Sequence, residues 1–119
     1  MSVTELVSKF YKSEAIAKHQ IIEAYLHDEL QVFWHSREGY LHLDKNDLMN
    51  YALNLEQAYS ASRFDITHLL NDGENVTIRY THFVTPIENP DQELILAHFM
   101  AIWEIKDQKL FKGYVMSQL

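Results

Sequence analysis

The sequence contains no cysteine, only three glycines and two prolines, and ten basic residues against seventeen acidic ones. Without cysteine, disulfides, thiol nucleophiles and thiolate metal sites are excluded. So few glycines leave no glycine-rich phosphate loop, and we expect no nucleotide or other cofactor. The formal net charge of −7 argues against nucleic acid or an anionic membrane as main partner, because both require a basic face.

Long hydrophobic runs are also missing. No stretch approaches the ~20 apolar residues that are needed to span a bilayer. The opening MSVTELVSKF has neither a basic region nor an apolar core, so no signal peptide is visible and we expect a cytoplasmic protein. Hydrophobic residues make up 47% of the 119 positions, enough for one core, and we expect a single domain over residues 1–119.

Helical spacing dominates the first third of the chain. Ser2 and Glu5 fit a capping box in front of apolar residues that recur on one helical face. Ser13 is a candidate start for a second helix, either separate from the first or its bent continuation. Asp44 is a candidate N-cap for a third helix, whose expected buried stripe is Leu48, Tyr51, Ala52, Leu55 and Tyr59.

Extended segments make up the rest of the chain. Residues 30–36, LQVFWHS, favour a strand that returns over 40–43. Short polar turns join four later extended segments, which we expect at 63–71, 75–86, 92–106 and 109–118. Because short links cannot make a parallel crossover, neighbouring strands are expected to run antiparallel. Helices followed by a run of strands predict an α+β fold.

The segment 92–106 is unusually long for a strand. Fifteen residues would extend ~50 Å if straight, so it must bend or twist, with a bulge as the expected device. A curved antiparallel sheet has a concave side that a few helices cover only in part. The sequence therefore predicts a cavity.

Three stretches resemble one known superfamily: YLHDELQVFWHSREGYLHLDKNDLMNYA, RFDITHLLNDGENVTIRYTHFVT and LAHFMAIWEIKDQKLFKGYVMSQ. Together they resemble the nuclear transport factor 2-like superfamily and, within it, the SnoaL-like, polyketide cyclase-like branch. The resemblance implies a cone-shaped fold, with N-terminal helices in the concave face of a strongly curved, mainly antiparallel sheet of about six strands. It also implies a mostly apolar pocket, but not one activity, since this superfamily contains several kinds of enzyme and non-enzymes.

One activity within the superfamily can be tested against the residues. The ketosteroid isomerases resembled here use a carboxylate base, a tyrosine and a protonated carboxylic acid. The resemblance places these three roles at Trp34, Phe10 and Ala101, none of which can do that chemistry. We therefore expect that reaction to be absent.

His82 is the candidate for other chemistry. In the expected strand VTIRYTHFVTP, His82 points to the same face as the apolar residues Val76, Ile78 and Tyr80. The resemblance implies that this face is the concave, pocket-facing side of the sheet. His82 and Tyr80 are the predicted catalytic pair, as a general acid and base. The alternative is a partly wet histidine, or one satisfied by a backbone carbonyl. The predicted ligand-binding residues are Trp34, Ile78, Tyr80, His82, Phe99, Ala101, Trp103 and Val115.

The residues that alternate with the pocket-facing ones point to the outer, convex side of the sheet and are also apolar. An apolar outer face is typical of an interface. We expect a two-fold homodimer through the convex side, unless a helix or terminal segment covers that side. The predicted interface residues are Leu96, His98, Met100, Ile102, Tyr114 and Met116.

The seven histidines are scattered singly and lack metal-ligand spacing, so no metal site is predicted. Two functions from different classes remain. The first is the binding of a small, largely apolar organic ligand in the cone cavity, with lyase, isomerase or cyclase-type acid–base chemistry. The alternative is a non-catalytic interaction module or accessory subunit that acts through the convex face.

Overall fold

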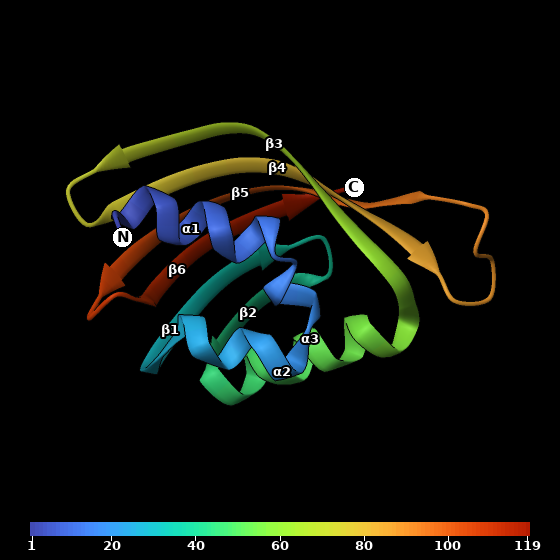
Figure 1. The fold of residues 1–119 in the computed structure, drawn as a ribbon, viewed down its shortest axis with the longest axis horizontal. Coiled ribbons are helices and arrows are strands. Elements are labelled where there is room, and N and C mark those ends of the chain that lie inside the picture. The colour runs from blue at the N-terminus through green and yellow to red at the C-terminus, as the bar shows by residue number, and fades with distance from the viewer.

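The strands form one six-stranded sheet, and the helices lie on its concave side (Figure 1). The structure is a computed structural model and describes all residues, 1–119. In chain order the elements are α1 (Val3–Lys12), η1 (Ala15–Ala17), α2 (His19–Ile22), η2 (Glu23–Tyr25), β1 (Leu26–Ser36), β2 (Gly39–Asp44), α3 (Lys45–Ala58), β3 (Tyr59–Asp72), β4 (Asn75–Pro86), β5 (Leu94–Lys106) and β6 (Lys109–Gln118).

The sheet order is β2-β1-β6-β5-β4-β3. Every neighbouring pair is antiparallel except β1 and β6, which run parallel. The parallel pair joins the first strand to the last, and the chain between them includes α3 and four strands, which is long enough for a crossover. This mixed, curled and open sheet confirms the predicted α+β cone fold.

Both long helices begin where the capping residues predict. The Ser2 hydroxyl accepts a hydrogen bond from the Glu5 backbone N–H at 3.1 Å. Asp44 and Asp47 form a reciprocal capping box at the start of α3, which satisfies two backbone donors. Tyr59 was expected on the helical stripe, but α3 ends at Ala58 and Tyr59 begins β3.

The chain from 13 to 25 does not form the second helix expected from Ser13. Ser13 is instead the C-cap of α1, and Glu14 follows it with a left-handed backbone, φ 61°. Lys18 is extended, with φ −136°, and separates η1 from the four-residue α2. An extended residue cannot continue the helical hydrogen-bond ladder, so this segment is a chain of short turns.

Bulges let the long strands curve around the helices. The β3–β4 register slips at Ser60 and Thr67, the β4–β5 register at Leu96 and the β5–β6 register at Phe111. Each bulge adds one unpaired residue to a strand and increases the local twist. The Leu96 bulge also reverses which residues face inward on either side of it.

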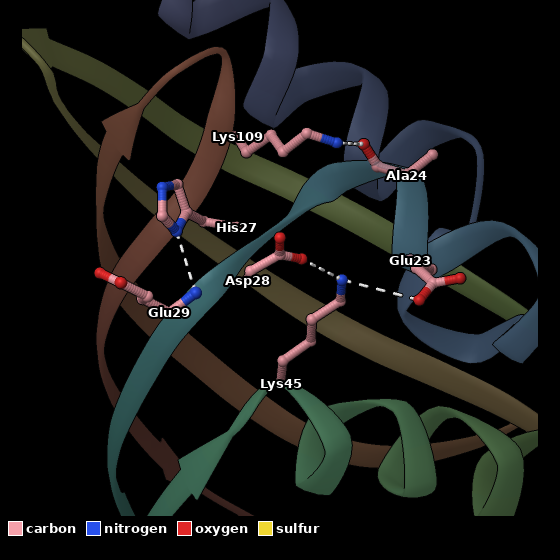
Figure 2. A network of polar contacts seen from close by, with 7 residues as sticks. All are labelled: Glu23, Ala24, His27, Asp28, Glu29, Lys45 and Lys109. Atoms are coloured by element: carbon pink, nitrogen blue, oxygen red, sulfur yellow. Dashed lines mark hydrogen bonds and ion pairs between the residues drawn. The ribbon is translucent and has the colours of Figure 1, made fainter.

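A polar network holds the start of α3 against the start of β1 (Figure 2). The Lys45 ammonium lies 2.8 Å from a carboxylate oxygen of Asp28 on β1 and 3.6 Å from one of Glu23. Nearby, Lys109 of β6 donates to the carbonyl oxygen of Ala24 at 3.0 Å. These contacts fix the first turn of α3 and the start of β6 to the segment that leads into β1.

Candidate functional site

The interior of the cone is almost solid. A void of only about 20 Å³ remains beneath the helices, which is about the space of one water molecule. Its walls are all hydrophobic: Tyr11, Ile16, Val32, Trp34, Leu48, Tyr51, Tyr80, Phe99, Trp103 and Val115. Five of the predicted ligand-binding residues are therefore brought together here, but around a space that is too small for an organic molecule.

A larger pocket of about 590 Å³ opens at the mouth of the cone, a volume typical of small-molecule sites. It lies between the β1–β2 hairpin, α3, the start of β5 and the end of β6. Its walls are Trp34, Ser36, Arg37, Glu38, Leu41, Leu43, Asp47, Asn50, Tyr51, Asn54, Leu55, Leu96, Ala97, Phe99, Ser117, Gln118 and Leu119. We call this the mouth pocket.

Three aromatic side chains line both the mouth pocket and the inner void: Trp34, Tyr51 and Phe99. The rings of Trp34 and Tyr51 lie perpendicular with centroids 5.3 Å apart, and Phe99 lies 6.0 Å from Trp34. Burial raises the pKa of the Tyr51 hydroxyl above its usual value, so this phenol stays neutral. The three rings form an uncharged floor that separates the pocket from the void.

One side of α3 supplies the polar wall of the mouth pocket. Asp47, Asn50 and Asn54 follow one another at spacings of three and four, which places them on one face of the helix. Asp47 is occupied in the capping box, whereas the amides of Asn50 and Asn54 have no partner within the chain. These residues were not predicted, although their spacing beside the apolar stripe is visible in the sequence.

His82 lines neither space. Its side chain is 2% exposed, and its Nε2 lies 2.9 Å from the hydroxyl of Ser62 on β3. The ring of Phe64 stacks on it at 4.3 Å. Burial lowers the pKa of His82 to about 4, so the imidazole is neutral at pH 7. Strand β3 thus covers the ring that strand alternation alone would place on an open wall.

Tyr80 lies deeper in the cone, against other aromatic rings. It stacks on Phe99 at 5.0 Å and tilts against Tyr11 at 4.5 Å. The Trp103 indole N–H donates to the Tyr11 hydroxyl at 2.9 Å. Burial raises the pKa of Tyr11 to about 12 and that of Tyr80 well above its usual value. Both phenols can donate hydrogen bonds, but neither is ionised near pH 7.

Ile78 and Ala101 are buried in the core and line neither space. Leu96 was expected on the convex face, but it lines the mouth pocket, because the bulge at Leu96 interrupts the alternation. The outer side chains His98, Met100, Ile102, Tyr114 and Met116 are exposed.

No group of three or more His, Asp or Glu side chains is arranged to hold a metal ion. No helix has the length and hydrophobicity that crossing a membrane requires.

Known structures share this architecture. A protein of Shewanella denitrificans that is assigned to the SnoaL-like polyketide cyclases superposes with a TM-score of 0.74 at 10% identity, covering 98% of this chain and 90% of that one. An NTF2-like protein of unknown function from Burkholderia pseudomallei gives 0.68 at 14% identity, covering 97% and 90%. A protein of Catenulispora acidiphila with a ketosteroid isomerase-like fold, in complex with trimethylamine, gives 0.72 at 10% identity, covering 93% and 83%.

No protein-family model matches the chain, and no curated protein matches it. At identities of 10–14% the structural likeness establishes the fold and no activity. The chain has the nuclear transport factor 2-like fold, with a protein assigned to the SnoaL-like polyketide cyclases among its structural neighbours, which confirms the fold that the sequence resemblance implied.

Proposed function

We propose that the mouth pocket binds a small, largely apolar organic molecule. The observation that carries this proposal is the pocket itself, about 590 Å³ with an aromatic floor and two free amides on one wall. Apolar walls with a few fixed polar groups are the usual composition of small-molecule sites. The apolar body of the ligand would rest on Trp34 and Phe99, and its polar group would face Asn50 and Asn54.

The binding of a small organic molecule also has a parallel in a structural neighbour, because the Catenulispora protein is in complex with trimethylamine. The neutral floor and the mixed rim of Arg37, Glu38 and Asp47 do not select strongly for one charge. A screen should therefore include small aromatic and alicyclic carbonyl compounds, alcohols and alkylamines.

The proposal is tested by a thermal-shift screen with matched variants. A ligand that binds only the folded state raises the melting temperature in proportion to the logarithm of its concentration. We expect hits to lose their effect in Asn50→Leu/Asn54→Leu and to keep it in Asn46→Leu, an exposed position of α3 outside the pocket. No hits, or hits that are indifferent to the pocket variants, would refute binding at this site.

Acid–base chemistry of the lyase, isomerase or cyclase type, with His82 and Tyr80 as the catalytic pair, stays a prediction. Each group is in the protonation state that its role requires, a neutral imidazole at His82 and a neutral phenol at Tyr80, although burial makes His82 a weaker base and Tyr80 a weaker acid. Both would require a substrate that passes the aromatic floor. Unchanged turnover of an identified substrate by His82→Ala would remove His82 from the mechanism.

A second candidate function rests on the convex face of the sheet. Two cross-strand rows run over all six strands there, and residues paired across strands point to the same side. The first row is His42, Phe33, Tyr114, Ile102, Thr77 and Leu70, and the second is Tyr40, His35, Met116, Met100, Arg79 and His68. We call these twelve residues the convex patch.

The charge of the convex patch favours a second copy of this chain as its occupant. Although the chain carries a net −7, the patch contains no carboxylate, and Arg79 is its one permanent charge. Exposed apolar side chains gather there, including Met100 at 52% and Met116 at 64% exposure. Two such faces can meet without bringing the acidic surfaces of the two copies together.

Sedimentation velocity tests this interface. We expect a dimer that Met100→Glu dissociates, because two-fold symmetry buries the new carboxylate twice. Ile21→Glu is the matched control, an exposed apolar residue of α2 that is outside the patch and should leave the dimer intact. A monomeric wild-type protein, or a dimer that survives Met100→Glu, would exclude the convex patch as the interface.

A further inference from the structure

Four of the seven histidines lie on or beside the convex patch. His42 and His35 are at the β2–β1 end, and His68 is at the β3 end. His98 is one row further along, where its Nδ1 lies 2.8 Å from the Thr81 hydroxyl. We propose that these histidines make self-association through the convex patch dependent on pH, with the dimer present above neutrality and lost in mild acid. This inference rests on the proposed dimer.

The packing of His42 and His35 shows why their charge matters. The ring of His42 stacks on Phe33 at 4.7 Å, and Phe33 stacks in turn on Tyr114 at 5.5 Å. His35 packs against Tyr40 at 4.8 Å. Both imidazoles therefore belong to the aromatic surface that a second copy would cover. Burying a charged imidazolium there costs far more than burying a neutral ring.

Few charges near the patch could compensate protonated histidines. Beyond His42, the next row on the same side contains one base, Lys112, and three acids, Asp44, Glu104 and Asp72. Asp44 is occupied in the α3 cap.

At the β3 end, Arg79 is the register partner of His68 and adds positive charge. Asp65, the partner of Thr81, is the one acid on the far border. Protonation would thus turn a nearly neutral face into a cationic one.

A histidine that is excluded from protonation in the dimer weakens association as pH falls. Each imidazole that is held neutral in the dimer weakens association about tenfold once about nine-tenths of that group is protonated in the free protomer. A two-fold dimer contains each histidine twice, so one fully buried position per protomer raises the dimer Kd about 100-fold.

The sign of this effect is diagnostic. The net charge of −7 makes two copies repel each other at neutral pH, and acidification reduces that charge. Non-specific electrostatics therefore predict tighter association in acid. A dimer that weakens in acid requires groups within the interface that take up protons on dissociation.

The experiment is sedimentation equilibrium of the full chain at pH 7.5, 6.5 and 5.5, with circular dichroism to confirm folding. We expect the dimer Kd to rise about 100-fold or more between the first and last pH. His35→Gln/His42→Gln should dimerise at pH 7.5 and lose most of that dependence. His19→Gln, on the helical side and paired with Glu56, should behave like the wild type.

Each outcome is decisive. A Kd that is constant or tighter in acid overturns the inference while the interface stands. Equal pH dependence in His35→Gln/His42→Gln also overturns it, because other groups would then carry the protons. A chain that is monomeric at every pH overturns both the inference and the proposed dimer.

Discussion

The indole N–H of Trp34 donates a hydrogen bond to the hydroxyl of Ser117 at 2.8 Å, and this bond joins the first strand to the last at the mouth pocket. It fixes the ring that separates the pocket from the inner void. Ser117→Ala should destabilise the fold by about 1 kcal/mol, because it leaves a part-buried donor unpaired. Urea unfolding measures this. Ser117→Thr, which keeps the hydroxyl, should cost less, and equal losses would contradict the role of the bond.

Gly113 leaves room for the largest buried ring. A Cβ at this position would stand 2.5 Å from a ring carbon of Trp103, which is closer than packed atoms tolerate. Gly113→Ala should therefore cost about 1–3 kcal/mol of unfolding free energy.

A double-mutant cycle checks the cause of this loss. Trp103→Leu removes the clashing ring, so the added cost of Gly113→Ala in that background should be much smaller. Additive losses would show that the strain arises elsewhere.

His82 should make the fold sensitive to acid. Its pKa is lowered by burial from 6.5 to about 4, so the unfolded chain binds a proton that the folded chain excludes. The stabilisation is complete above pH 6.5 and is lost as pH falls toward 4, by about 3 kcal/mol in total. Denaturant unfolding at pH 7.5, 5.5 and 4.5 measures the slope.

The matched variant for that measurement is His82→Gln, which can still bond to Ser62 but does not titrate. Its stability should fall less steeply between pH 6.5 and 4. Asp28 and Glu93, whose pKa values are lowered by Lys45 and Arg63, contribute equally to both proteins and cancel. Parallel slopes would contradict a buried, neutral His82.

Local rules were sufficient for most of the fold. Segments 75–86 and 109–118 were predicted with the bounds of β4 and β6, because each alternates cleanly between short turns. The cap at Asp44 was also correct, since capping depends on neighbouring residues alone. The prediction of a helix from Ser13 was wrong. The backbone is left-handed at Glu14 and extended at Lys18, and the spacing of apolar residues does not reveal either conformation.

The candidate site was less accessible to sequence reasoning. Alternation placed Leu96 on the convex face, but a bulge resets alternation and depends on strand pairing across the sheet. His82 was expected on an open wall, yet Phe64 and Ser62 of β3 cover it, which is a tertiary contact. The amides of Asn50 and Asn54 were passed over because the helical analysis followed only the apolar stripe.

The two tryptophans allow the most direct test of the central claim, that a ligand binds at the mouth of the cone and not inside it. Trp34 lines the mouth pocket, whereas Trp103 lies in the core. In Trp103→Phe, titration with a thermal-shift hit should change the emission of Trp34, and in Trp34→Phe the emission of Trp103 should stay constant. A response from Trp103 with none from Trp34 would contradict the account and place the ligand within the cone.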